Sequence, residues 1–252
     1  MESPHGAAVA AEDFGLEGPR GRVFRHVTFS AEPGSLVAIE GPSGSGRTCL
    51  LLALTGRMRT TEGHARTGGL RLPQQAAAVR RIAALGPVPA VNELDPAFTV
   101  AEHLNERALL QGRYGASLRT LLRPRAERRA AAGARIDAAL QAAGLDLATL
   151  PKAGRTSVRD LERLEALRLS VALALIGEPR LLAVDDTDLK LADAERDRAW
   201  ALLRSVADAG TTVLAVCSEA PENTQVVRTA PATEAPTTEE ETVDAHSEAG
   251  RA

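Results

Sequence analysis

The chain has 252 residues, a length that fits one large domain or two smaller ones. Hydrophobic residues at 44% and charged residues at 25% are ordinary globular values, so the composition excludes a chain that is disordered throughout. The net charge of −3 excludes a global basic field for nucleic acid or anionic lipid. Aromatic residues at 2% also argue against a stacking platform for single-stranded nucleic acid.

The two cysteines, Cys49 and Cys217, are too few for a disulfide framework or a four-cysteine zinc site. They favour a reduced, cytosolic protein. No apolar run approaches the 18 residues needed to cross a bilayer, and the first residues lack an apolar signal core. If the protein works at a membrane, another chain is expected to bring it there.

The first third of the chain predicts a strand, a glycine-rich loop and a helix in succession. Residues 1–12 are small and polar and are expected to form a flexible leader. Short apolar runs predict strands at 23–29 and 36–40, and residues 48–54 predict an apolar helix. The second strand runs directly into the glycine-rich stretch between them.

The rest of the chain predicts a helical middle and a parallel sheet. Helices are expected at 99–110 and 124–143, then a strand at 181–184, a helix at 192–208 and a strand at 211–216. A strand–helix–strand order implies parallel strands. Residues 223–252 are rich in Glu, Thr and Pro and poor in apolar residues, which predicts a disordered acidic tail.

The glycine-rich stretch has the spacing of a phosphate-binding loop, G-x-x-x-x-G-K-[ST], in the sequence Gly41-Pro42-Ser43-Gly44-Ser45-Gly46-Arg47-Thr48. Glycine is needed because only a backbone without Cβ folds tightly enough to aim successive N–H groups at phosphate oxygens. The following helix adds its N-terminal dipole, and the Thr48 hydroxyl is a hard oxygen ligand for Mg²⁺. Arg47 stands where lysine is expected; it keeps the charge on a broader, planar group.

With these motifs in place, the chain resembles the ATP-binding subunit of an ABC transporter over about residues 14–222. The resemblance is carried by the segment 27–38, the loop, the stretch 94–104 and the run 174–186, in the family's order. It implies an α/β P-loop NTPase of ABC-cassette type with an inserted helical subdomain at about 92–175. It also implies ATP and Mg²⁺ as ligands.

The resemblance assigns roles to individual residues. Thr48 and Asp185 would hold Mg²⁺, and Asp186 is the candidate for activating the attacking water. The expected nucleotide-binding residues are Gly41, Pro42, Ser43, Gly44, Ser45, Gly46, Arg47, Thr48 and Cys49.

The implied partners are a transmembrane permease subunit and a second nucleotide-binding subunit, identical or different. The implied location is cytoplasmic, peripheral at the inner face of the membrane through that partner. No nucleic-acid partner is expected, because the family's translation-related members carry two cassettes and this chain has room for one.

Several catalytic positions depart from the family's pattern. Asp186 replaces glutamate, which shortens its reach by about 1.5 Å. Ser218 stands at the switch histidine and does not titrate near neutral pH. The expected glutamine is Ala90, with Asn92 as the alternative in a shifted alignment.

The family's signature sequence aligns with residues 161–165, which contain no glycine and two glutamates. The spacing of Ser157 and Asp160 predicts a capping box and a helix from Val158. In that case the signature position would lie inside a helical turn with few free N–H groups, unsuited to clamping ATP across a dimer.

Two functions remain open at this point. The first is an energising ATPase subunit with weak hydrolysis. The second is a non-catalytic nucleotide-sensing or scaffolding protein on the same fold.

Overall fold

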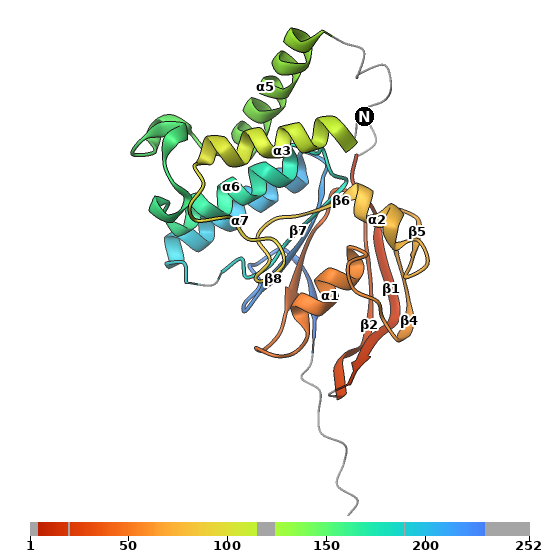
Figure 1. The fold of residues 1–252 in the computed structure, drawn as a ribbon. Coiled ribbons are helices and arrows are strands. Elements are labelled where there is room, and N and C mark those ends of the chain that lie inside the picture. Colours follow the sequence, from red (N-terminus) through yellow and green to blue (C-terminus); the bar gives the residue numbers. More distant parts are fainter. Residues whose placement is uncertain (1–4, 20, 115–123, 189, 230–252) are drawn as a thin grey trace, which may run out of the picture.

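The computed structural model describes residues 5–19, 21–114, 124–188 and 190–229. Two sheets and a group of helices make up these residues (Figure 1). A five-stranded parallel sheet has the order β6-β7-β8-β3-β9, and a four-stranded antiparallel sheet has the order β2-β1-β4-β5. In Figure 1 the helices α3, α6 and α7 gather on one side, with α5 projecting outward, and α1 lies on the side of the antiparallel sheet.

The strands are β1 (Val9–Gly18), β2 (Gly21–Ala31), β3 (Leu36–Glu40), β4 (Glu62–Thr67), β5 (Leu70–Leu72), β6 (Ala83–Leu85), β7 (Leu181–Val184), β8 (Thr212–Cys217) and β9 (Gln225–Arg228). The α-helices are α1 (Arg47–Leu54), α2 (Ala76–Ile82), α3 (Val100–Tyr114), α5 (Arg125–Ala142), α6 (Arg163–Leu175) and α7 (Asp193–Asp208).

The parallel sheet is buried on both faces, which explains why its strands are continuous apolar runs. Successive side chains of a strand point to opposite faces. In β3, Val37 and Ile39 pack with α1 and the antiparallel sheet, whereas Leu36 and Ala38 pack with the helical layer. The strands β7 and β8 divide their side chains between the same two clusters. The parallel sheet is therefore the layer shared by both hydrophobic cores.

The parallel sheet and its flanking helices confirm the main sequence predictions. The predicted strands at 36–40 and 181–184 coincide with β3 and β7, and the other predicted strands and helices correspond to β2, β8, α1, α3, α5 and α7. The helices α3, α5 and α6 lie in the sequence between β6 and β7, as an insertion in an α/β fold requires.

Two predicted boundaries are wrong. The leader was expected to reach residue 12, but β1 begins at Val9. Within this strand, Ala11 pairs with Phe29 of β2 and with Ala65 of β4. The acidic tail was expected from residue 223, but Gln225–Arg228 form β9 along β3. Residues 230–252 of the predicted tail lie outside the described residues.

The predicted start of the signature helix is also wrong. Residues Val158–Asp160 form a single 3₁₀ turn, and the Ser157 side chain caps no N–H group. The α-helix α6 begins at Arg163, where the Glu165 carboxylate accepts a hydrogen bond from the Glu162 N–H at 2.8 Å. The signature position therefore lies at a helix N-terminus instead of inside a turn.

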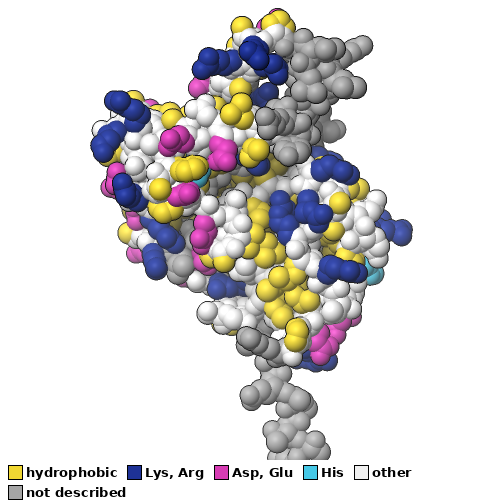
Figure 2. Space-filling model, viewed as in Figure 1, with side chains coloured by type: hydrophobic (Ala, Val, Ile, Leu, Met, Phe, Trp, Pro, Cys, Tyr) yellow, Lys and Arg dark blue, Asp and Glu magenta, His cyan; other side chains and the backbone are white. Residues whose placement is uncertain are grey.

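Some arginine side chains of the helical layer donate hydrogen bonds to backbone carbonyls. The Arg107 Nε, on α3, donates to the Leu173 carbonyl of α6 at 3.1 Å. Over the helical layer, Figure 2 shows carboxylates standing among the Lys and Arg side chains. This mixture of signs is what a net charge near zero leads one to expect.

The position of β9 predicts that residues 223–229 stabilise the domain. Val227 is 6% exposed, and β9 covers one edge of β3. Burial of one valine contributes about 1.5–3 kcal/mol. We expect a chain ending at Glu222 to unfold about 5–10 °C below a chain ending at Thr229 in thermal denaturation. Equal unfolding temperatures for the two chains would contradict this role of β9.

Candidate functional site

The phosphate loop, residues 41–48, links β3 to α1 in a conformation that requires glycine. Gly44 and Gly46 have φ values of +80° and +81°, which side chains rarely adopt. A Cβ atom on Gly46 would lie 2.5 Å from the Val23 carbonyl oxygen, so the loop is packed directly against β2. The Gly46 carbonyl then accepts the first helical hydrogen bond, from the Leu50 N–H at 2.8 Å. The loop N–H groups thus lead into the N-terminus of α1.

The base of the loop is fixed by Thr229, the residue that follows β9. The Ser45 and Thr229 hydroxyl oxygens lie 2.7 Å apart, and both residues are buried. The Thr229 N–H donates to the Glu40 carbonyl at 2.9 Å. A Cβ atom on Gly41 would lie 2.5 Å from the Thr229 hydroxyl. The first glycine of the motif is therefore required by close packing against Thr229.

Thr48 and Asp185 lie together, as the sequence predicted. The Thr48 hydroxyl donates to Asp185 Oδ2 at 2.7 Å, and the Asp186 N–H donates to Asp185 Oδ1 at 3.0 Å. Asp185 is 2% exposed. Burial raises the pKa of its carboxyl, while the hydrogen bond from Thr48 lowers it. A hydroxyl beside a buried carboxylate is a set of hard oxygen donors that fits Mg²⁺.

A cavity of about 600 Å³ opens beside the phosphate loop. It is lined by Glu40, Gly41, Pro42, Ser43, Arg47, Asp186, Ser218, Arg228 and Thr229. Six of these residues were predicted as site residues or catalytic positions from the loop motif and the family resemblance: Gly41, Pro42, Ser43, Arg47, Asp186 and Ser218. Sequence reasoning missed Glu40, Arg228 and Thr229. The adjacent β-branched residues Val226 and Val227 were the one sequence signal for the strand that brings Arg228 and Thr229 to this place.

Arg47 is held by the carboxyl end of β8. Its Nη1 donates to the Cys217 carbonyl oxygen, although the side chain also lines the cavity. A guanidinium is long and planar enough to reach across the loop to the neighbouring strand. The loop cation is therefore bonded to protein backbone in this structure.

The end of β8 is shaped by Asp188. Its carboxylate accepts hydrogen bonds from the Ser218 N–H at 2.7 Å and the Glu219 N–H at 3.3 Å. Asp186 and Ser218 both line the cavity, so the structure brings these two predicted positions together. Asp186 adopts a positive φ of 49°, a conformation that costs about 1 kcal/mol or more outside glycine and marks a constrained position.

Ala90 and Asn92, the alternatives for the family's glutamine, do not line this cavity. The Asn92 amide donates to the Leu85 carbonyl at 3.1 Å and the Gly86 carbonyl at 2.8 Å. Its side chain therefore holds the chain after β6. The Ala90 N–H donates to the Glu93 carboxylate at 2.9 Å.

The two cysteines are not poised for chemistry. Burial, followed by the carboxylates of Asp188 and Glu40, raises the pKa of the Cys217 thiol to about 12. Burial and then the Asp185 carboxylate raise the pKa of Cys49. Cys49, predicted among the nucleotide-binding residues, packs against the core shared by α1 and the antiparallel sheet. Both thiols remain protonated near neutral pH.

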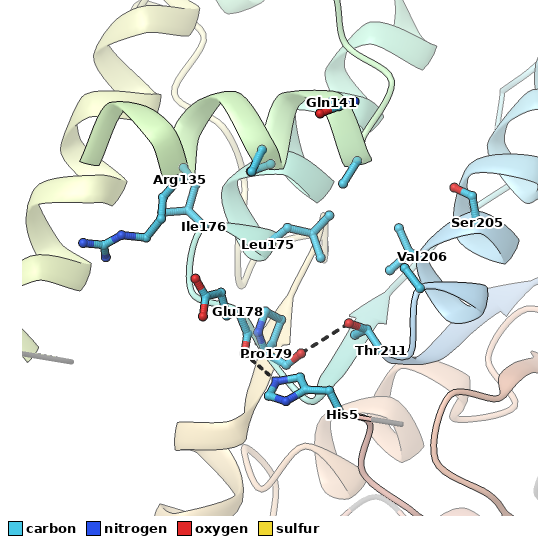
Figure 3. Close-up of a pocket in the computed structure, with 14 residues that line it drawn as sticks. His5, Arg135, Gln141, Leu175, Ile176, Glu178, Pro179, Ser205, Val206 and Thr211 are labelled. Carbon is cyan, nitrogen blue, oxygen red and sulfur yellow. Dashed lines mark hydrogen bonds between the residues drawn. The ribbon is translucent and has the colours of Figure 1, made fainter. Parts of the chain in front are cut away.

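A second cavity, of about 560 Å³, lies among α5, α6 and α7 (Figure 3). Leu175 and Val206 line it, and the His5 ring contacts the Glu178 carbonyl at 3.3 Å at its edge. The Arg135 guanidinium points away from these apolar side chains in Figure 3. Among the described residues no group of three His, Cys, Asp or Glu side chains could hold a metal ion. The phosphate-loop cavity, which is lined by residues of the motif and by Asp186, is the candidate site.

The family model described as ABC transporter matches residues 24–188, which is more than half of the chain. The chain belongs to the ABC transporter family. Its curated relatives include the Nod factor export ATP-binding protein I of Cupriavidus metallidurans, 30% identical over 192 residues. That match covers 76% of this chain and 56% of the relative. The protein of the same name from Cupriavidus pinatubonensis is 30% identical over 214 residues, covering 85% of this chain and 55% of the relative.

Solved ABC cassettes share the fold. The dimeric structure of the cassette MJ0796 superposes with a TM-score of 0.67 at 18% identity, covering 89% of this chain and 95% of that chain. Its post-hydrolysis state bound to ADP and Pi gives a TM-score of 0.63 at 20% identity, over 84% of this chain and 88% of that chain. This ABC chain spans little more than half the length of the curated relatives described above. None of its described helices has both the length and the apolar character to cross a bilayer.

The burial of Asp185 predicts a stabilising substitution. Because its native pKa is raised, the charged carboxylate destabilises the fold above that pKa, and the cost disappears as the pH falls below the pKa of the unfolded chain. In Asp185→Asn the oxygen still accepts the Asp186 N–H, and the amide can donate to the Thr48 hydroxyl.

We therefore expect Asp185→Asn to unfold a few degrees higher than the unchanged chain at pH 8 without nucleotide. The difference should shrink toward pH 4. Thermal unfolding followed by circular dichroism at both pH values measures it. A lower unfolding temperature for the variant at pH 8 would show that the charged form is favoured in the fold.

Proposed function

We propose that this chain binds Mg-ATP in its phosphate loop as the nucleotide-binding subunit of an ABC transporter, and that it hydrolyses ATP slowly. The observation that carries the proposal is the hydrogen bond of 2.7 Å between Thr48 and Asp185, directly beside the loop. It joins the two metal-binding positions of the family's motif across α1 and β7. The proposed cassette runs from Val9 to Thr229, wider than the predicted 14–222, because β1 and β9 belong to its sheets.

The residues of the loop would divide the work of binding. Backbone N–H groups of residues 41–48 would cradle the phosphates, aided by the N-terminal dipole of α1. Thr48 and Asp185 would bind Mg²⁺, which neutralises phosphate charge when present. Arg47 would exchange the Cys217 carbonyl for phosphate oxygens, because a guanidinium binds an anionic oxygen more strongly than a neutral carbonyl.

Two features support slow hydrolysis. Asp186 reaches the cavity with a carboxylate one carbon shorter than the family's glutamate, and proton transfer depends first on hydrogen-bond distance. Ser218, at the switch position, offers a hydroxyl where the family has an imidazole. Of the two carboxylates that line the cavity, Asp186 stands at the family's catalytic position and remains the candidate for activating water.

The N-terminus of α6, which contains this chain's signature position, is unsuited to bind ATP held by a facing subunit. Glu162 and Glu165 stand at the start of the helix, and the Glu162 N–H is already bonded to the Glu165 carboxylate. Two carboxylates repel a triphosphate held by a facing subunit. Because the chain belongs to the ABC transporter family and a solved cassette of this fold is a dimer, we propose that it pairs with a second cassette and with a permease at the cytoplasmic face of the membrane.

A second function, nucleotide sensing or scaffolding without turnover, is favoured by the Arg47–Cys217 hydrogen bond. If Arg47 remains bonded to the Cys217 carbonyl at the end of β8, only the loop amides and Mg²⁺ would bind the phosphates. The two functions differ in turnover and share the phosphate loop.

Nucleotide binding is tested by thermal unfolding with ATP, with and without Mg²⁺. We expect Mg-ATP at 100 times its dissociation constant to stabilise the unchanged chain by about 2.7 kcal/mol. Thr48→Val keeps the shape of the side chain but removes the hydroxyl, so we expect it to lose the Mg²⁺-dependent part of the shift. Identical shifts for the two chains would rule out Thr48 as a metal ligand.

The catalytic proposal is tested by ATP hydrolysis of the purified chain. We expect slow turnover, and at least a tenfold increase in Arg47→Lys/Asp186→Glu, because general-base catalysis contributes about 10²–10⁴-fold where the geometry is right. The single variants Arg47→Lys and Asp186→Glu, measured alongside, separate the contribution of each change. An unchanged chain that turns over at an ordinary enzymatic rate, with no gain from the double change, would contradict the proposal.

A further inference from the structure

A second arginine reaches the phosphate-loop cavity from β9. The parallel register pairs Arg228 with Glu40, the residue that precedes the loop. Strand β9 therefore ends beside the start of the loop, and Arg228 lines the cavity together with Ser43, Asp186 and Ser218. The position of this arginine follows from strand pairing and lies outside the phosphate-loop motif.

The contacts of Arg228 leave its guanidinium available. Its Nη2 lies 3.7 Å from the Glu40 carboxylate, longer than a hydrogen bond, and its side chain is 76% exposed. By contrast, the guanidinium of Arg47 is bonded to the Cys217 carbonyl. Of the two cations that line the cavity, Arg228 is thus the one with the weaker interactions with other protein groups.

The charges that line the cavity show where an anion is favoured. Two carboxylates, Glu40 and Asp186, and two guanidiniums, Arg47 and Arg228, contribute to the lining. Glu40 is near Arg228, so a phosphate oxygen that bonds this guanidinium competes with one loose ion pair. At 3.7 Å, with the guanidinium in contact with solvent, this ion pair is a weak competitor.

We propose that Arg228 binds the outermost phosphate of the nucleotide and gives the site its preference for a triphosphate over a diphosphate. This inference rests on the proposed binding of nucleotide in the loop. In a phosphate loop the cation of the motif reaches the outer phosphates, and Arg47 lines the same cavity as Arg228. Ser218 follows β8 and Arg228 ends β9, on opposite sides of β3, so Arg228 adds a positive charge on the side of the phosphate loop opposite Ser218.

The planar guanidinium also suits the ligand. Arginine presents paired N–H donors that match two oxygens of one phosphate group. A diphosphate that fills only the loop would leave this fork unused, so removal of Arg228 should weaken the triphosphate more than the diphosphate. Lysine at this position would keep the charge and lose the paired donors.

The test is calorimetric titration of Mg-ATP and Mg-ADP into the full chain and into Arg228→Gln, Arg228→Lys and Arg66→Gln. Arg66 is an exposed arginine of β4, on the antiparallel sheet, and serves as the matched control. We expect Arg228→Gln to bind ATP about tenfold more weakly and ADP within about twofold of the unchanged chain. Arg228→Lys should lie between the two, and Arg66→Gln should bind both nucleotides normally.

The outcomes separate this inference from the function on which it rests. Equal affinity of Arg228→Gln and the unchanged chain for ATP, or an equal loss for ATP and ADP, would overturn the role of Arg228 and leave nucleotide binding intact. No binding of either nucleotide by the unchanged chain would overturn both. Thermal unfolding of each variant without nucleotide establishes that it is folded, and Arg228→Lys remains informative if Arg228→Gln is not.

Discussion

The parallel order of β7, β8, β3 and β9 is the constraint on which the candidate site depends. Because the carboxyl ends of parallel strands meet at one edge of a sheet, residues far apart in the sequence are brought together there. Asp185 follows β7, Ser218 follows β8, the phosphate loop follows β3 and Arg228 ends β9.

The sequence was informative where a feature depends on local chemistry. Buried parallel strands read as short apolar runs, so β3 and β7 could be placed without a partner strand. The loop could be predicted because its glycines are needed for backbone conformation and close packing, as Gly46 against Val23 shows. The pairing of Thr48 with Asp185 followed from the resemblance to the family and is present as a hydrogen bond.

The features that sequence reasoning missed depend on contacts between distant segments. Strand β9 has only two apolar residues and is stabilised by β3, so its composition resembled the start of a tail. The helix α6 starts five residues late because a 3₁₀ turn at Val158–Asp160 precedes it, and no propensity distinguishes these two geometries over three residues. Asn92 has the chemistry of a site residue, yet its amide satisfies two backbone carbonyls after β6.

The central claim is that the amides of the phosphate loop receive a triphosphate although the adjacent cation is an arginine. A crystal structure of the full chain with Mg²⁺ and a non-hydrolysable ATP analogue tests it most directly. The account predicts phosphate oxygens on the N–H groups of residues 41–48, Mg²⁺ at Thr48 and Asp185, and Arg47 released from the Cys217 carbonyl. An empty loop at saturating analogue, with Arg47 still bonded to Cys217, would contradict it.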